Sequence, residues 1–347
     1  MVQRRVAALN CHGQGVIVEQ DLPELAPGQV QVKVVASLIS PGTELGRVKQ
    51  LRREKGEERP ARPFGYANAG VIERVAQGVE QFAVGDRVAC MGGGYALHAD
   101  RACVPQNLCA AIPDGVSFEA AASVHLAATG LHAIRRTLPL FGENGMIMGM
   151  GLVGQFSAQF GQLSGCHIMA VDGNEMRLER ARAWGVEKTV QGSIEDPVQT
   201  AKDFSLHFGM DFGIIAFGGD ASSAFEQLYG SLKQTPDGHR MGRITIVGGA
   251  HISHGFAAGL GNVDVRSAAR TGPGYHDEAY EHGQNYPAVF VEWPTQRNLD
   301  ECLRSMASGA LQVEPLYTHE FALDDIAEAV DVLVETPEKA LGVVLKP

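Results

Sequence analysis

The sequence predicts an α/β protein that combines a β-rich domain with a doubly wound parallel sheet. Short strand patterns dominate residues 1–120, whereas strand and helix patterns alternate from residue 121 onward. The chain has 347 residues, more than one ordinary hydrophobic core supports. We therefore expect a first domain over 1–120 and a second over 121–270. Residues 271–347 should form a substrate loop and a segment that returns to the first domain.

The N-terminal part is interpreted as mostly β because its apolar residues alternate in short runs. Residues 29–40 alternate and end at Pro41-Gly42, and further strand patterns cover 69–76 and 84–91. The charged stretch around 44–55 is interpreted as a short helix with a solvated face.

Strand and helix patterns alternate from Ser117, which can cap a helix whose first turn contains Glu119. This βαβα order predicts a parallel sheet with helices on both faces. The expected strands are 145–150, 167–172, 188–190, 212–218 and 243–249, and the expected helices are 153–165, 174–185 and 222–232. The C-terminal part then predicts a helix from 323 to 333 and a last strand over 342–346.

The composition limits the classes of partner. Hydrophobic residues at 45% and charged residues at 20% are typical of a soluble globular protein. A net charge of −11 argues against nucleic acid or an anionic membrane, which leaves a small-molecule partner. No apolar stretch reaches the roughly 18 residues that a membrane helix needs. Six cysteines without a C-x-x-C pair suggest reduced thiols and a cytoplasmic protein.

A glycine-rich turn between an expected strand and an expected helix points to a dinucleotide. Gly149, Gly151 and Gly154 form G-x-G-x-x-G, and Asp172 ends the next strand 18 residues after Gly154. The glycines allow a tight turn, close approach to a pyrophosphate and close helix packing. An acid at Asp172 accepts hydrogen bonds from ribose hydroxyls and repels a 2′-phosphate, and no arginine directly follows it, so NAD is favoured over NADP. The candidate cofactor residues are Gly149, Gly151, Leu152, Val153, Gly154, Asp172, Gly248 and Gly249.

Several stretches together with this architecture resemble the medium-chain dehydrogenase/reductase (alcohol dehydrogenase-like) family. The resemblance is carried by "VVASLISPGTELG", "FGYANAGVI", "VGDRVA", "AAASVHLAATGLHAI", "GMGLVGQ" and "FALDDIAEAVDVL". It implies a GroES-like catalytic domain, a Rossmann NAD-binding domain and an alcohol dehydrogenase activity. A homodimer or homotetramer is expected.

The chain departs from that family where many members bind a catalytic zinc. Pro41 stands at the position of the first ligand, a cysteine, and Tyr66 stands at the position of a ligating histidine. Ala67 replaces the glutamate that follows it, and His125 matches the third ligand position. One imidazole does not hold a zinc that needs three protein ligands. We therefore predict a zinc-free branch and no metal.

Without zinc, a side chain must take the proton of the alcohol while hydride leaves for the nicotinamide. By the family resemblance, His125, Tyr66 and Thr43 match positions that surround the substrate oxygen. His125 has a suitable pKa for a base, Tyr66 can hydrogen-bond the oxygen, and Thr43 can relay a proton. Glu44 is a further candidate carboxylate, and a structural role is its alternative interpretation.

The segment 272–293 resembles a stretch found in zinc-free branches of the family. Its hydroxyls, imidazole and aromatic faces suit a secondary alcohol on a sugar, cyclitol or other cyclic compound. A surface excursion or a dimer contact is the alternative. The candidate substrate residues are Tyr275, His276, Tyr280, Asn285 and Tyr286.

Three other functions remain open at this point. The first is an NAD(P)H-dependent quinone or enoyl reductase, against which Asp172 counts. The second is an enzyme that keeps NAD bound and uses transient oxidation for elimination or epimerisation. The third is a non-enzymatic NAD-binding protein.

Overall fold

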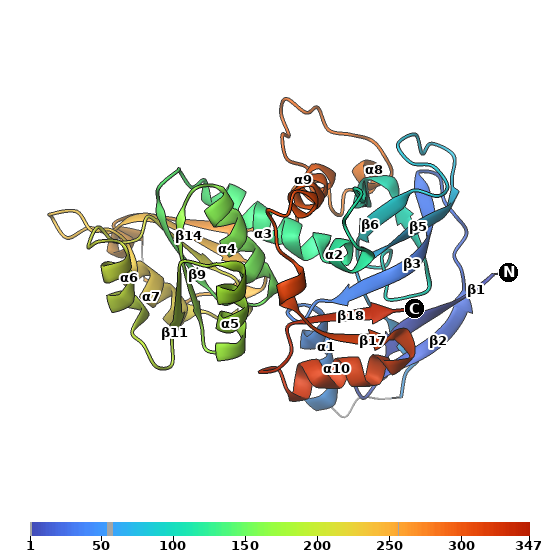
Figure 1. The fold of residues 1–347 in the computed structure, drawn as a ribbon, viewed down its shortest axis with the longest axis horizontal. Helices are drawn as coiled ribbons and strands as arrows, with labels where there is room; N and C mark the ends of the chain where they lie inside the picture. The colour runs from blue at the N-terminus through green and yellow to red at the C-terminus, as the bar shows by residue number, and fades with distance from the viewer. Residues whose placement is uncertain (1, 54–57, 256) are drawn as a thin grey trace. The chain divides into compact units, whose positions relative to one another are not determined.

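A computed structural model describes residues 2–53, 58–255 and 257–347. The chain divides into two compact units (Figure 1): unit 1 comprises Met1–Ala128 and Thr271–Pro347, and unit 2 comprises Thr129–Arg270. The mostly β first unit and the parallel sheet of the second confirm the predicted α/β class. The two units divide the chain after residues 128 and 270, and the domain boundaries expected after residues 120 and 270 stay a prediction.

Unit 1 is built around a seven-stranded sheet in which strands from both ends of the chain pair. The order is β17-β18-β3-β5-β6-β8, with β7 also paired to β3. The strands are β3 (Gln29–Ile39), β5 (Ala67–Val75), β6 (Arg87–Met91), β7 (Arg101–Pro105), β8 (Cys109–Ala111), β17 (Tyr317–Ala322) and β18 (Gly342–Lys346). The last strand, β18, pairs antiparallel with β3, with Val343 opposite Ile39. The C-terminal segment is thus part of the same sheet as the N-terminal one.

A smaller three-stranded sheet and several helices complete unit 1. The sheet has the order β2-β1-β4. These elements are β1 (Gln3–Leu9), β2 (Gly15–Asp21), β4 (Arg62–Pro63), α1 (Glu44–Arg53), α2 (Phe118–Ala122), α8 (Glu278–Glu281), α9 (Thr295–Ala307) and α10 (Ile326–Glu335). The helix expected over 44–55 begins at Glu44 and ends at Arg53, and its last two expected residues lie outside the described part of the chain.

Helix α1 is fixed by an apolar face that packs on α10. Leu45, Val48 and Leu51 recur at helical spacing and are buried. They join a core cluster with Ile326 and Val330 of α10. Because α1 and α10 lie together in Figure 1, this packing holds the start of α1, and therefore Glu44, in a defined position.

Unit 2 is a six-stranded parallel sheet with the order β11-β10-β9-β12-β14-β16. Helices α4 and α5 pack on one side of the strands in Figure 1, and α6 and α7 lie on the other. The strands are β9 (Asn144–Met148), β10 (His167–Asp172), β11 (Lys188–Gln191), β12 (Phe212–Ile215), β14 (Met241–Val247) and β16 (Asn262–Ala268). The helices are α4 (Leu152–Leu163), α5 (Glu175–Trp184), α6 (Pro197–Phe204) and α7 (Ser222–Ser231). Helix α3 (Val124–Thr137) begins in unit 1 and belongs to unit 2 from Thr129 onward.

The strand order of unit 2 reverses beside β9. This strand lies between β10 and β12, so the chain leaves it in opposite directions on the two sides. In doubly wound sheets, ligands bind at the carboxyl ends of the strands at such a reversal. The loop that follows β9 is the glycine-rich turn.

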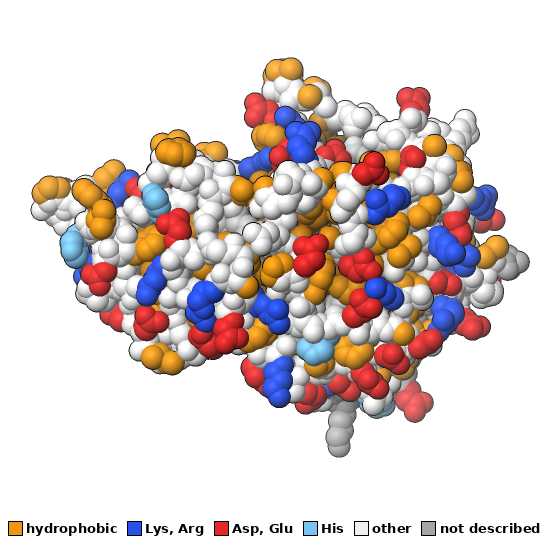
Figure 2. Space-filling model, viewed as in Figure 1, with side chains coloured by type: hydrophobic (Ala, Val, Ile, Leu, Met, Phe, Trp, Pro, Cys, Tyr) orange, Lys and Arg blue, Asp and Glu red, His pale blue; other side chains and the backbone are white. Residues whose placement is uncertain are grey.

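The surface has mixed charge. On the face shown in Figure 2, Lys and Arg side chains are interspersed with Asp and Glu side chains. Among the described residues, no helix has the length and apolar character needed to cross a bilayer.

Candidate active site

Tyr66 and His125 form a close aromatic pair in unit 1. Their ring centroids lie 4.4 Å apart with an interplanar angle of 49°. The Nδ1 atom of His125 lies 3.4 Å from the Tyr66 carbonyl oxygen. Tyr66 comes directly before β5, because the strand begins at Ala67, whereas His125 lies in the first turn of α3. Two residues 59 positions apart in the sequence are thereby brought into one site.

Gly65 sets the turn that places Tyr66. Its φ is +119°, and a Cβ atom at this position would lie 2.3 Å from the backbone nitrogen of His98. A side chain would meet both a strained backbone and a steric clash. Glycine therefore allows the chain to pass close to His98 before it enters β5.

Burial sets the protonation states of the pair. His125 is 8% exposed, and burial lowers its pKa from 6.5 to about 4, against a smaller opposite effect of the Tyr66 carbonyl. Burial, and next the charge of Glu44, raise the pKa of Tyr66, while hydrogen bonds with Ser40 and Thr43 partly oppose that rise. At neutral pH, the imidazole is therefore uncharged and the phenol keeps its proton.

The lowered pKa of His125 predicts a defined loss of stability in acid. The unfolded chain takes up a proton near pH 6.5, but folded His125 does so only near pH 4. As pH falls through this window, the unfolded state gains protons that the folded state lacks, so the free energy of unfolding decreases. The full effect is about 3 kcal/mol. The free energy of unfolding, measured by urea titration between pH 4 and 7, should lose this part of its pH dependence in His125→Asn. The control His12→Asn, at an exposed position, should keep it. Equal pH dependence in the two variants would contradict this role of His125.

Tyr275 lies beside this pair. Its ring centroid is 6.2 Å from that of His125, at 81°, and its hydroxyl accepts a hydrogen bond from the Gly93 N–H at 2.8 Å. His276 stacks on Tyr275 with a centroid distance of 3.9 Å. Of the five candidate substrate residues, Tyr275 therefore lies next to the candidate acid–base pair, and His276 lies on Tyr275.

The other three candidate substrate residues contact one another or neighbouring residues of unit 1. Tyr280 is 1% exposed and stacks on Tyr286 at 4.8 Å. Tyr286 donates a hydrogen bond to Asp277 at 2.6 Å, and Asn285 accepts one from Asn107 at 2.9 Å. These contacts order the segment, and a direct role of the three side chains in substrate binding stays a prediction.

Glu44 is the centre of a buried polar network. Its Oε1 lies 3.2 Å from Nε2 of His98, and its Oε2 accepts a hydrogen bond from the Ser40 N–H at 2.6 Å. The Nδ1 atom of His98 lies 2.9 Å from the Ser37 hydroxyl. The carboxylate is thus engaged in structure, which agrees with the alternative interpretation of Glu44. The sequence did not predict the pairing of Glu44 with His98. The one sequence feature that could have indicated it is that His98 lies in an otherwise apolar run.

Removal of the Glu44 carboxylate should be costly to the fold. Glu44→Leu leaves the Ser40 N–H and His98 without their buried acceptor, so we expect the free energy of unfolding to fall by about 3 kcal/mol. Glu44→Gln keeps an acceptor and should lose roughly half as much. Urea denaturation measures both, with the exposed Glu58→Leu as the matched control. An effect of Glu44→Leu no larger than that of the control would contradict this role.

The residues around His125 do not form a recognisable zinc site. The aromatic neighbours of its ring are Tyr66 and Tyr275, and phenols are not the ligands that protein zinc sites normally use. Glu44 is already held by His98 and Ser40. Within residues 2–53, 58–255 and 257–347, no cluster of three or more His, Cys, Asp or Glu side chains suits a metal ion.

The glycine loop of unit 2 fits a dinucleotide pyrophosphate. Gly149 has φ +92°, which allows the turn after β9. A Cβ on Gly154 would lie 1.8 Å from the Gly149 oxygen, so only glycine lets α4 pack this close to the turn. Gly151 caps α4, and nothing lies within 4 Å of where its Cβ would be. This open space at a helix N-terminus is suited to a phosphate group.

The acidic residue at the end of β10 lies against the same loop. Asp172 Oδ2 accepts a hydrogen bond from the Met150 N–H at 2.6 Å, and Oδ1 accepts one from the Asn174 N–H at 2.7 Å. Arg177 Nη1 lies 3.7 Å from Asp172 Oδ2. Arg177 does not directly follow Asp172 in the sequence, so it was missed as a neighbour. Helix α5 begins at Glu175 and places Arg177 close to the carboxylate.

The remaining candidate cofactor residues flank the loop and the end of β14. Leu152 is buried and Val153 half-buried in the first turn of α4. Gly248 has φ +73°, and neither it nor Gly249 would place a Cβ within 4 Å of another group. Their contact with a cofactor stays a prediction.

Comparison with known proteins adds to this geometry. Residues 26–125 match the family model for the alcohol dehydrogenase GroES-like domain. The chain is 26% identical to the L-idonate 5-dehydrogenase of Vitis vinifera, over 89% of this chain and 86% of that protein. It is also 26% identical to the sorbitol dehydrogenase of Arabidopsis thaliana, over 86% of this chain and 83% of that protein. A structure described as a short chain alcohol dehydrogenase from Escherichia coli CFT073 complexed with cofactor NADH has a TM-score of 0.77, 17% identity and 100% coverage of both chains.

The fold combines a GroES-like domain with a Rossmann-type parallel sheet. Over residues 26–125, and at low identity over most of its length, the chain is similar to alcohol dehydrogenase-like proteins of the medium-chain dehydrogenase/reductase type.

Proposed function

We propose that this chain is an NAD-dependent oxidoreductase that transfers hydride between a secondary alcohol and NAD without a catalytic zinc. The alcohol is of the polyol or cyclic class, such as a sugar or cyclitol. The observation that carries the proposal is the Tyr66–His125 pair, with a neutral imidazole beside a protonated phenol. Relatives named for L-idonate and sorbitol support the substrate class.

The cofactor is assigned to unit 2. Gly149, Gly151 and Gly154 leave room for a pyrophosphate at the N-terminus of α4, and Asp172 offers a carboxylate for the ribose hydroxyls. The fold neighbour solved with NADH supports the same cofactor. NAD, when bound, supplies the acceptor for the hydride. The carboxylate of Asp172 disfavours a 2′-phosphate, although Arg177 lies close to it.

Tyr66 and His125 supply the acid–base chemistry in this proposal. When Nδ1–H of His125 faces the Tyr66 carbonyl, Nε2 carries the lone pair that can take the hydroxyl proton. The Tyr66 hydroxyl keeps its proton and donates a hydrogen bond to the substrate oxygen as negative charge develops there. Thr43 hydrogen-bonds with Tyr66 and is exposed, so it orients the Tyr66 hydroxyl, while its predicted role as a proton relay for the proton that His125 accepts stays a prediction. General acid–base groups of this kind contribute about 10²–10⁴-fold to rate.

Zinc independence is supported by the residue types at the site. Pro41 and Tyr66 occupy positions where zinc-using relatives are expected to have ligands, and neither side chain is a usual ligand. His125 is the one imidazole in the pair. In this proposal, the Tyr66–His125 pair therefore assists removal of the hydroxyl proton, which a metal ion would otherwise assist.

The test is a screen of NAD and NADP reduction with polyols and cyclic secondary alcohols. We expect NADH formation with at least one polyol, and a lower kcat/KM with NADP than with NAD. Tight NAD binding with no turnover across the panel would instead favour a non-enzymatic NAD-binding protein. Substrate conversion without net NADH would favour transient oxidation, and activity with quinones or enoyl compounds alone would favour a reductase.

A further inference from the structure

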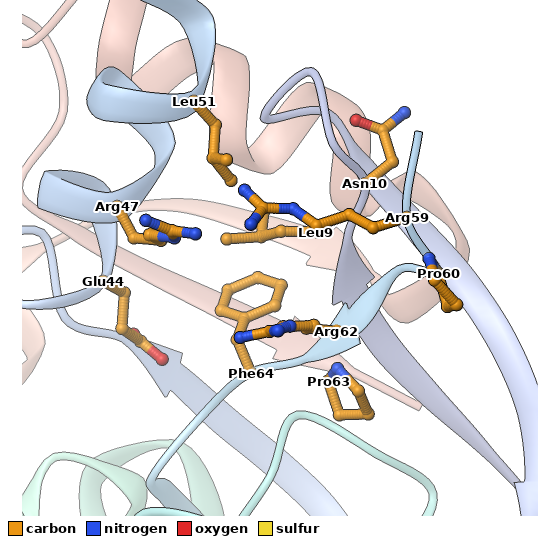
Figure 3. A pocket seen from close by; sticks show the side chains of 10 residues that line it. All are labelled: Leu9, Asn10, Glu44, Arg47, Leu51, Arg59, Pro60, Arg62, Pro63 and Phe64. Atoms are coloured by element: carbon orange, nitrogen blue, oxygen red, sulfur yellow. The ribbon is translucent and has the colours of Figure 1, made fainter. Parts of the chain in front are cut away.

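A pocket of about 220 Å³ lies in unit 1 (Figure 3), and among its described lining residues the one candidate catalytic residue is Glu44, which is held by His98 and Ser40. It is formed by the end of β1, by α1 and by the segment that leads into β4 and Phe64. Tyr66, His125 and Tyr275 do not line it. The lining residues are Leu9, Asn10, Glu44, Arg47, Leu51, Arg59, Pro60, Arg62, Pro63 and Phe64.

Three arginines face this pocket from two segments of the chain. Figure 3 shows the guanidinium groups of Arg47, Arg59 and Arg62 directed inward around Phe64 and Leu9. The chain as a whole has a net charge of −11, so the positive charge of this cluster is opposite in sign to the net charge of the protein. Like charges repel, so the arrangement is favourable when an anion lies between them.

The lining supplies little negative charge to balance the arginines. Glu44 is the one carboxylate among the described lining residues, and it is engaged by the Ser40 N–H and His98. Arg47 donates a hydrogen bond to the neutral amide of Gln50 at 2.8 Å. Because Arg47, Arg59 and Arg62 are exposed, their side chains can adjust to a ligand.

The floor of the pocket is apolar. Leu9 and Leu51 are 7% and 4% exposed, and the half-buried Phe64 ring lies between the arginines in Figure 3. Phe64 is held in place by an edge contact with His98, with centroids 5.1 Å apart. The pocket thus offers a hydrophobic surface under a ring of planar, forked donors. Arginine is well suited to phosphate because its guanidinium makes paired hydrogen bonds to two oxygens.

We propose that this pocket is a binding site for a small organic phosphate whose ester group is apolar or aromatic. The phosphate oxygens accept hydrogen bonds from Arg47, Arg59 and Arg62, and the ester group packs on Phe64 and Leu9. Inorganic phosphate fits the charge but not the apolar floor. A neutral aromatic fits the floor but not the arginines. This site is distinct from the proposed NAD site, whose residues belong to unit 2.

Isothermal titration calorimetry of the full chain with phenyl phosphate tests the proposal. We expect one molecule bound per chain, at least about tenfold more tightly than inorganic phosphate or phenol. The same affinity is expected when NAD is present at saturation, because the residues involved differ. Binding no tighter than that of inorganic phosphate, or loss of binding when NAD is added, would overturn the proposal.

Arginine variants locate the site. Arg59→Gln and Arg62→Gln should each weaken phenyl phosphate binding about tenfold, since each removes a charged hydrogen-bond donor. Both residues are exposed, so the variants should fold, which circular dichroism verifies. Arg304→Gln on α9 removes an exposed arginine outside the pocket and should bind as the wild type does. Wild-type affinity in both pocket variants would refute the assignment, whatever the outcome of the alcohol screen.

Discussion

Replacement of His125 by asparagine is expected to lower kcat for oxidation of the alcohol by about 10²-fold or more, with NAD affinity unchanged. Asparagine keeps a polar side chain of similar size but cannot accept a proton at neutral pH. The lowered pKa of His125, to about 4, means that the wild-type imidazole is uncharged over the whole neutral range and can accept a proton, although as a weaker base than a solvent-exposed histidine. Steady-state kinetics and NAD titration measure the two effects separately.

Tyr66→Phe is the companion variant. It removes the hydroxyl while the ring that contacts His125 remains, so a loss of about 10²-fold in kcat is expected from the lost hydrogen bond to the developing oxyanion. The exposed His12→Asn serves as the control and should retain wild-type turnover. Full activity in both His125→Asn and Tyr66→Phe, with NAD still bound, would show that the acid–base groups lie elsewhere.

Gly154→Ala is expected to abolish NAD binding and to destabilise unit 2 severely. The new Cβ would lie 1.8 Å from the Gly149 oxygen, which is backbone and cannot move aside without distortion of the turn after β9. We expect a loss of more than about 3 kcal/mol in the free energy of unfolding. Thermal denaturation and NAD titration measure the two effects.

Gly151→Ala is the matched control for this steric argument. Its φ is −65°, and its Cβ would meet nothing within 4 Å, so the fold should be almost unaffected. NAD affinity should still fall, because the methyl group occupies the space assigned to the pyrophosphate. A Gly154→Ala protein with wild-type stability, or a Gly151→Ala protein with wild-type NAD affinity, would contradict the proposed use of the loop.

The sequence predicted the features that depend on local pattern. Ser117 does cap its helix, with its hydroxyl accepting from the Ala120 N–H at 3.1 Å. Alternating strand and helix signals predicted the parallel sheet, whose order reverses beside β9. The glycine spacing predicted a turn that the φ of Gly149 and the crowding at Gly154 now explain. These features follow from residue spacing within one or two elements.

The sequence did not reveal contacts between distant segments. Glu44 and His98 are 54 residues apart, and nothing in either local pattern indicates that they meet. Arg177 returns to Asp172 because a helix begins between them. The arginine pocket joins Leu9 with residues from 44–51 and 59–64, which the sequence indicated only as a charged helix and the approach to a strand. Such sites depend on packing, in this case that of α1 against α10.

The central claim is that an organic acid–base pair replaces a catalytic zinc. The most direct test is kcat for the best alcohol substrate before and after treatment with a strong zinc chelator, with the metal content of the same sample measured by mass spectrometry. The account predicts less than about 0.1 equivalent of zinc per chain and unchanged kcat, since the site lacks the three protein ligands that zinc requires. One equivalent of zinc per chain, with activity lost on chelation and restored by added zinc, would contradict it.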